Sequence, residues 1–165
     1  MQSSTPAVIN DLVAAALSQY ASLPFAPQPG KFTVLASFAL HEPRSGRTGL
    51  LSLGAGVKCL PASRLPVRGD ALHDSHAEVI ARRGAIRWLL EEVRRDAQAP
   101  GSSPWVRARP DGLYALRDDV HLWMYASTVP CMCTVTPDPD DSVSLSASTR
   151  AMAPTCQFPQ SSFVL

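Results

Sequence analysis

Two apolar segments separated by a short polar turn constrain the fold of this chain more than any other feature. Residues 31–41 (KFTVLASFALH) are rich in β-branched and apolar side chains, which is typical of a buried strand. Residues 44–49 favour a turn, and residues 50–58 (LLSLGAGVK) have the composition of a second strand. Because so short a turn leaves the two strands adjacent, we expect an antiparallel hairpin here.

Helical periodicity marks two further segments. Residues 8–20 carry apolar side chains at helical intervals after an Asn-Asp start. Residues 75–95 form the clearest helix, and Asp74 or Ser75 is the expected N-cap. The apolar stripe of this second helix is predicted to consist of Val79, Ile86, Leu89, Leu90 and Val93.

The remaining segments set the domain organisation. Residues 60–69 are predicted to form a loop, and residues 119–128 (DVHLWMYAST) a third strand that runs directly into a Pro-Cys pair. Residues 134–165 are dominated by Pro, Ser, Thr and Asp without usable periodicity. We therefore expect a folded part over residues 1–133 and a low-complexity, disordered tail over residues 134–165.

Length and composition fit one domain. The chain has 165 residues, of which 45% are hydrophobic, and this excludes a wholly disordered protein. No apolar run approaches the roughly 18 residues of a spanning helix, and the N-terminus lacks a basic signal-peptide region, so we expect a soluble, non-secreted protein. Four cysteines are too few for a disulfide framework, which favours reduced thiols and a cytosolic or nuclear location.

The net charge of +1 gives no general field for polyanions and excludes a basic nucleic-acid tail. Thirteen of the fifteen basic residues are nevertheless arginines, many of them between residues 64 and 117. Since the planar guanidinium suits multidentate phosphate recognition, a local phosphate site is compatible with this composition.

Two short motifs carry the chemistry. His76-Ala77-Glu78 stands at a predicted helix start, and Pro130-Cys131 directly follows a predicted strand. This is the H-x-E and P-C pattern of the zinc-dependent nucleobase deaminases. Imidazole and thiolate ligands hold zinc and leave a position for water, and a nearby carboxylate that is not a ligand moves protons. In the first helical turn both His76 and Glu78 can reach the space beyond the helix end.

Each of these residues also has a purely structural explanation. A lone histidine at a helix start is more often a cap or a surface residue, and a glutamate such as Glu78 in the first turn is favoured by the helix dipole. Cys131 by itself could be a small buried hydrophobe, and Cys59 is expected in the core. The combination of motifs, rather than any one residue, indicates the metal site.

Three longer runs carry a family resemblance. They are LGAGVKC at residues 53–59, HDSHAEVIARR at residues 73–83 and MYASTVPC at residues 124–131. Together they resemble the adenosine deaminase family that edits RNA, most closely its tRNA-specific branch. The resemblance extends over roughly residues 8–131 and implies an α/β fold of the cytidine-deaminase type, with a mixed sheet flanked by helices and incomplete at its C-terminal end.

The resemblance also implies roles for individual residues. His76 matches the zinc-binding histidine, Glu78 the proton-shuttling glutamate and Cys131 the first zinc-binding cysteine. Positions around a buried inositol hexakisphosphate in this family are matched by Lys58, Asp74, Arg82 and Arg83. Because Arg82 falls on the predicted apolar stripe with Ile86, it needs a counter-ion, which the phosphate groups would supply.

The chain departs from the family after Cys131. The family continues with Gly-Asp-Ala, whereas Met132, Cys133 and Thr134 follow here, and a later S-C-S-D-K-type motif for the third zinc ligand is missing. Cys133 and Cys156 are the candidates for that ligand. We expect a truncated or mis-spliced chain.

Three functions follow from these observations. The resemblance implies hydrolytic deamination of adenosine to inosine next to the anticodon of a tRNA, with tRNA as partner and with zinc and inositol hexakisphosphate as cofactors. The first alternative is a catalytically inactive fragment that retains at most RNA or partner binding. The second is a free-nucleoside or cytidine deaminase that uses His76, Cys131 and Cys133.

Overall fold

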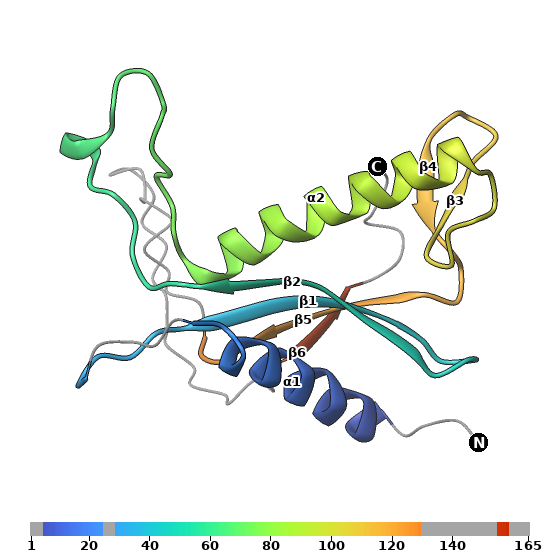
Figure 1. Ribbon diagram of the computed structural model, residues 1–165, viewed down its shortest axis with the longest axis horizontal. Helices are drawn as coiled ribbons and strands as arrows, with labels where there is room; N and C mark the ends of the chain where they lie inside the picture. The colour runs from blue at the N-terminus through green and yellow to red at the C-terminus, as the bar shows by residue number, and fades with distance from the viewer. Residues whose placement is uncertain (1–4, 25–28, 130–154, 159–165) are drawn as a thin grey trace, which may run out of the picture.

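The computed structural model describes residues 5–24, 29–129 and 155–158, which form a four-stranded sheet with one helix on each face (Figure 1). In chain order the elements are α1 (Thr5–Ala21), β1 (Leu35–Glu42), β2 (Arg47–Ala55), the 3-10 helix η1 (Ala62–Arg64), α2 (Ala77–Gln98), β3 (Val106–Ala108), β4 (Tyr114–Leu116), β5 (His121–Ala126) and β6 (Thr155–Phe158). The predicted α/β class is confirmed. Neither helix in these stretches is long and apolar enough to cross a membrane.

The sheet has the order β2-β1-β5-β6, and its neighbouring strands are antiparallel. The predicted hairpin is confirmed as β1–β2, but its turn is tighter than the expected residues 44–49. Gly46 adopts a φ of 69°, a left-handed conformation that glycine accepts readily, so that Arg47 already pairs with Glu42. The tight turn therefore moves the start of β2 three residues earlier than predicted.

The last strand lies within the segment that was expected to be a disordered tail. Residues 155–158 form β6 and pair with β5, where Cys156 lies opposite Met124. A strand edge with unpaired N–H and C=O groups readily accepts another strand, and Thr-Cys-Gln-Phe contains the β-branched and aromatic residues that favour one. Over these four residues the structure differs from the expected tail.

The central strand β1 is buried on both faces, which explains its nearly continuous apolar sequence. Phe38 and Leu40 belong to the larger core cluster between the sheet and α2. Ala39 points to the opposite face, where it packs with Trp123 of β5 and Leu12 of α1. The sheet thus separates two hydrophobic clusters.

The buried face of α2 differs from the predicted stripe. It consists of Ala77, Ala81, Ala85, Leu89, Glu92 and Asp96. Leu90 is 54% exposed, and Arg82, which was expected on the apolar stripe, is exposed as well. Small alanines bring this helix so close to β2 that a Cβ atom on Gly54 would lie 2.2 Å from the carbonyl oxygen of Ala77. The close approach of α2 to β2, rather than the size of the apolar side chains, therefore determines which face of the helix is buried.

A small hairpin of β3 and β4 covers the C-terminal half of α2 and was not predicted (Figure 1). Its strands have three residues each, which is too short for an alternating pattern to be recognised. Val106 and Leu116 of this hairpin join the larger core cluster. The hairpin therefore extends the core beyond the edge of the main sheet.

Candidate functional site

A two-stranded neck positions His76 at the start of α2. Residues 56–60 leave β2 and run beside residues 73–77, which lead into the helix. Backbone hydrogen bonds join the two segments from Leu60 to the carbonyl of His73 (2.7 Å), from Ser75 to Lys58 (3.0 Å) and from Ala77 to Gly56 (3.2 Å). A Cβ atom on Gly56 would lie 2.0 Å from the carbonyl oxygen of Ser75, so this approach requires glycine.

Asp74 holds His76 by two hydrogen bonds. Its Oδ1 accepts one from the backbone N–H of His76 at 2.9 Å and one from the imidazole Nδ1 at 2.8 Å. Asp74 and Ser75 were the predicted N-caps, but the structure places His76 itself at the N-cap, with an extended backbone (φ −63°, ψ 143°). The Asp74 carboxylate instead holds His76, the N-cap residue, through these two hydrogen bonds.

Electrostatics favour the ionised form of the Asp74 carboxyl. Burial raises the pKa of the Asp74 carboxyl, but the hydrogen bonds from His76 and the nearby imidazoles of His76 and His73 lower it more, so the pKa lies below its usual value. An ionised carboxylate only accepts hydrogen bonds, so Nδ1 of His76 is the donor of the 2.8 Å contact. A carboxylate that holds a histidine through Nδ1 is the usual arrangement beside metal-binding histidines, in which Nε2 is the ligand atom.

Glu78 lies two residues after His76, in the first turn of α2, and its side chain is partly buried. The structure therefore brings His76 and Glu78 to the same end of one helix, as the sequence predicted. His76 is almost fully buried, with 5% exposure. In this arrangement the buried imidazole of His76 can hold a metal ion. The carboxylate of Glu78, at the same helix N-terminus, can move protons next to it.

Two of the three basic residues predicted for the inositol phosphate, Lys58 and Arg83, lie near Asp74. The guanidinium of Arg83 donates to the carbonyl oxygen of Asp74 at 3.5 Å, and Lys58 lies in the neck segment beside it. The side chains of Lys58, Arg82 and Arg83 are exposed. Among the described residues, neither Lys58 nor Arg82 forms an ion pair with a carboxylate.

The cysteine candidates are placed only in part. Cys131 and Cys133 fall outside the described residues, and for Cys156 the structure gives its backbone position on β6. Cys59, expected in the core, is exposed in the neck because its segment leaves the sheet. Within residues 5–24, 29–129 and 155–158, no three His, Cys, Asp or Glu residues form a metal site.

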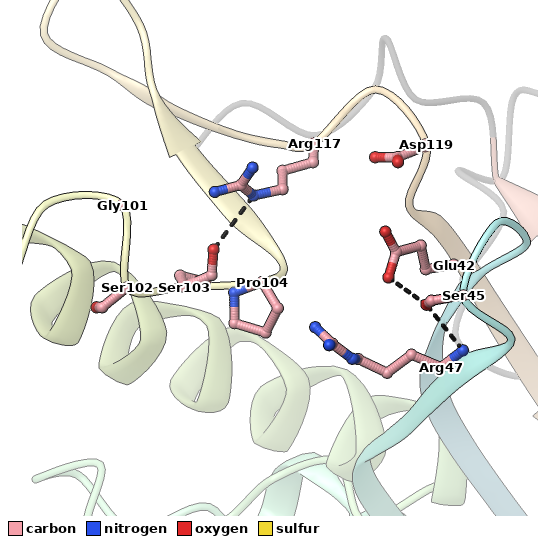
Figure 2. A pocket seen from close by; sticks show the side chains of 9 residues that line it. All are labelled: Glu42, Ser45, Arg47, Gly101, Ser102, Ser103, Pro104, Arg117 and Asp119. Atoms are coloured by element: carbon pink, nitrogen blue, oxygen red, sulfur yellow. Dashed lines mark hydrogen bonds between the residues drawn. The ribbon is translucent and has the colours of Figure 1, made fainter.

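A polar cavity at the opposite end of α2 was not predicted from the sequence. It has a volume of about 390 Å³ and lies between the β1–β2 turn and the segments on either side of the β3–β4 hairpin (Figure 2). Arg47 and Arg117 are among its lining residues, together with Glu42 and Asp119. The concentration of arginines in the middle of the chain was the available signal, but the hairpins that bring them together are distant in sequence.

Comparisons with known proteins match the region that contains His76. The family described as the adenosine-deaminase (editase) domain matches residues 52–155, which is more than half of the chain. The tRNA-specific adenosine deaminase 1 of Macaca fascicularis is 40% identical over 82 residues, 50% of this chain and 16% of the relative. The protein of that name from Drosophila melanogaster is 37% identical over 90 residues, 53% of this chain and 23% of the relative.

A second group of relatives is more distant. The double-stranded RNA-specific adenosine deaminase of Rattus norvegicus is 30% identical over 99 residues, 59% of this chain and 8% of the relative. The chain thus spans less than a quarter of the length of each of these three proteins.

Proposed function

The chain belongs to the adenosine-deaminase (editase) domain family, and from this premise we propose that it contributes the His76–Glu78 part of a zinc site for hydrolytic deamination of adenosine in tRNA. The observation that carries the proposal is the buried imidazole of His76, whose Nδ1 is 2.8 Å from the carboxylate of Asp74. The names of the relatives with the higher identities support tRNA as the substrate.

His76 and Cys131 are the proposed zinc ligands, with Cys133 or Cys156 as candidates for the third. Zinc held by these residues would supply hydroxide near neutral pH, because it would lower the pKa of a bound water. Asp74 orients His76 by accepting a hydrogen bond from its Nδ1–H, so that Nε2 would be the atom that holds the metal. The thiolate ligands need reducing conditions, which fits a cytosolic or nuclear location.

Glu78 is the proposed proton carrier. Its carboxylate accepts a proton from the attacking water, delivers it to N1 of the adenine as the C6–O bond forms, and assists transfer to the amine as the C6–N6 bond breaks. One water is consumed, and inosine and ammonia are released. The base must leave its stack in the RNA for C6 to reach the site.

Lys58, Arg82 and Arg83 are the proposed ligands of inositol hexakisphosphate. Their exposed positive charges, none of which forms an ion pair with a carboxylate in the described part of the chain, favour a polyanion. Asp74 connects the two sites, because its carboxylate binds His76 and its carbonyl accepts from Arg83.

Zinc content tests the proposal. We expect the reduced chain to bind about one zinc, measured by plasma mass spectrometry and by competition with a chromogenic chelator. His76→Ala should abolish binding, and Asp74→Asn should weaken it by about 10- to 100-fold because the carboxylate orients the ligand. Cys59→Ala is the matched control, since it removes an exposed thiol of the same neck, and it should bind zinc within about twofold of the original chain.

Substrate assays separate the functional alternatives. Conversion of adenosine to inosine in tRNA, abolished by Glu78→Gln, supports the proposal. Zinc binding without any deamination indicates the inactive fragment, and conversion of free cytidine or adenosine in preference to tRNA indicates the free-nucleoside enzyme. Equal zinc affinity of the chain and of His76→Ala contradicts the proposed site.

A further inference from the structure

The cavity at the C-terminal end of α2 has an ordered wall. Ser103 is 1% exposed, and its hydroxyl donates a hydrogen bond to Glu92 at 2.8 Å. The same hydroxyl oxygen accepts hydrogen bonds from the backbone N–H groups of Trp105 and Val106, both at 3.1 Å. Its own backbone N–H donates to Asp96 at 3.0 Å. With its buried groups satisfied, the segment that lines the cavity is held rigidly on α2.

Two guanidinium groups border this cavity. The Nε of Arg117 donates to the carbonyl oxygen of Ser103 at 3.2 Å, which leaves its terminal nitrogens for the cavity. The guanidinium of Arg47 lies 5.9 Å from the ring centre of Trp105, a cation–π contact. Trp105 itself is held close to β2, since a Cβ atom on Gly49 would lie 3.2 Å from its ring.

Two carboxylates face the same space. Figure 2 shows Arg117 and Asp119 along one edge of the cavity and Glu42 and Arg47 along the other. Glu42 accepts a hydrogen bond from Ser45 at one oxygen. Within the described residues, none of these four charged groups forms an ion pair with another. Opposite charges that share a cavity without contact favour a ligand with both acceptors and donors.

A second cavity of about 320 Å³ extends the site. It shares Arg117 and Asp119 with the first and adds Arg44 and the Arg107–Asp118 ion pair. The two cavities therefore lie side by side, and the second adds two further arginines to the first pair. This number of guanidinium groups favours a phosphate ester with a hydroxyl-bearing body over a compact zwitterion such as an amino acid.

We propose that this cavity binds a ribose phosphate. Arg47 and Arg117 donate to the phosphate oxygens, for which the guanidinium fork is well suited, and Glu42 and Asp119 accept from the ribose hydroxyls. A volume of about 390 Å³ falls in the usual range for small-ligand sites. The chemistry is shared by a free nucleotide and by one unit of an RNA strand. The site is independent of His76, which lies at the other end of α2.

Calorimetric titration of the full chain tests this assignment. Ribose 5-phosphate should bind saturably and at least about tenfold more tightly than inorganic phosphate, because only the ester reaches the carboxylates. Arg117→Gln should weaken both ligands by about tenfold or more, whereas Asp119→Asn should weaken ribose 5-phosphate alone. Arg87→Gln, which removes an exposed arginine of α2 outside the cavity, is the matched control and should leave both affinities unchanged.

Further measurements distinguish a free nucleotide from an RNA strand and test whether each variant is folded. A single-stranded RNA hexamer that binds at least about tenfold more tightly than AMP identifies an RNA strand, and equal affinities identify a free nucleotide. Arg47→Gln repeats the test without touching Ser103, and circular dichroism verifies the fold of each variant. Absence of saturable binding overturns the proposal, as does equal affinity for phosphate and ribose 5-phosphate with no effect of Asp119→Asn. The zinc assay reports separately on the deaminase site.

Discussion

At the scale of single residues, buried ionisable groups show what their surroundings impose. His41 of β1 is 5% exposed, and its Nδ1 has no hydrogen-bond partner among the described residues. Burial lowers the pKa of this imidazole most, and the nearby His121 lowers it further, against weaker opposing effects from the backbone of Arg47 and the charge of Glu42. The neutral form of His41 is therefore favoured in the folded state.

This shift predicts a pH dependence of stability. The folded pKa of His41 lies below its unfolded value of about 6.5. Above that pH the imidazole is neutral in both states, and its titration does not lower the free energy of unfolding. As the pH falls below about 6.5, the unfolded chain takes up a proton first, and the free energy of unfolding drops by at most about 1.4 kcal/mol per pH unit until the folded pKa is reached. Urea unfolding between pH 5 and 8 should show a flatter profile for His41→Gln; parallel profiles contradict the prediction.

At the scale of elements, the contact between α2 and β2 depends on backbone proximity. Gly54 of β2 faces the helix so closely that a Cβ atom would lie 2.2 Å from the carbonyl oxygen of Ala77 and 2.7 Å from the amide nitrogen of Ala81. Both neighbours are backbone atoms of a helix and cannot rotate away. The helix and strand would have to separate to accept any side chain at this position.

Gly54→Ala should therefore lower the free energy of unfolding by about 2–3 kcal/mol through overpacking, despite the higher strand propensity of alanine. Denaturant unfolding monitored by circular dichroism measures the change. Gln98→Ala, at an exposed position near the end of the same helix, should change stability by less than about 0.5 kcal/mol. A loss at Gly54 no larger than that of this control would show that the interface adapts.

At the scale of the whole molecule, α2 connects two separate polar sites. Its 22 residues span about 33 Å, with Asp74 and His76 before one end and the Ser103 wall beyond the other. Neither site shares a hydrogen-bonding partner with the other among the described residues. The helix serves as a rigid spacer between them.

The two sites should accordingly be energetically independent. The effects of Asp74→Asn and Arg117→Gln on the free energy of unfolding, measured without zinc, should add in the double variant to within about 0.5 kcal/mol. The ribose phosphate affinity of Asp74→Asn should equal that of the unchanged chain. A coupling energy above about 1 kcal/mol would indicate that the helix transmits strain between its ends.

The sequence by itself determined the elements whose patterns are local. The β1–β2 hairpin and β5 follow from runs of apolar residues, α2 follows from helical periodicity, and the placement of His76 and Glu78 in one helical start follows from their spacing. Periodicity and turn chemistry act between residues close in the chain, so they are visible without a fold. Cys131 and Cys133 lie outside the described residues, so their roles stay predictions.

Only the tertiary structure decided which surfaces meet. The buried face of α2 follows its alanines because glycine and alanine allow the helix to approach β2, and the periodic stripe gave no sign of this. Asp74 was expected at the phosphate site on resemblance, and only the structure shows that its carboxylate also binds His76. The cavity of Arg47 and Arg117 arises from two hairpins about 70 residues apart. Contacts of this kind depend on distances across the fold, which the local pattern of a chain does not encode.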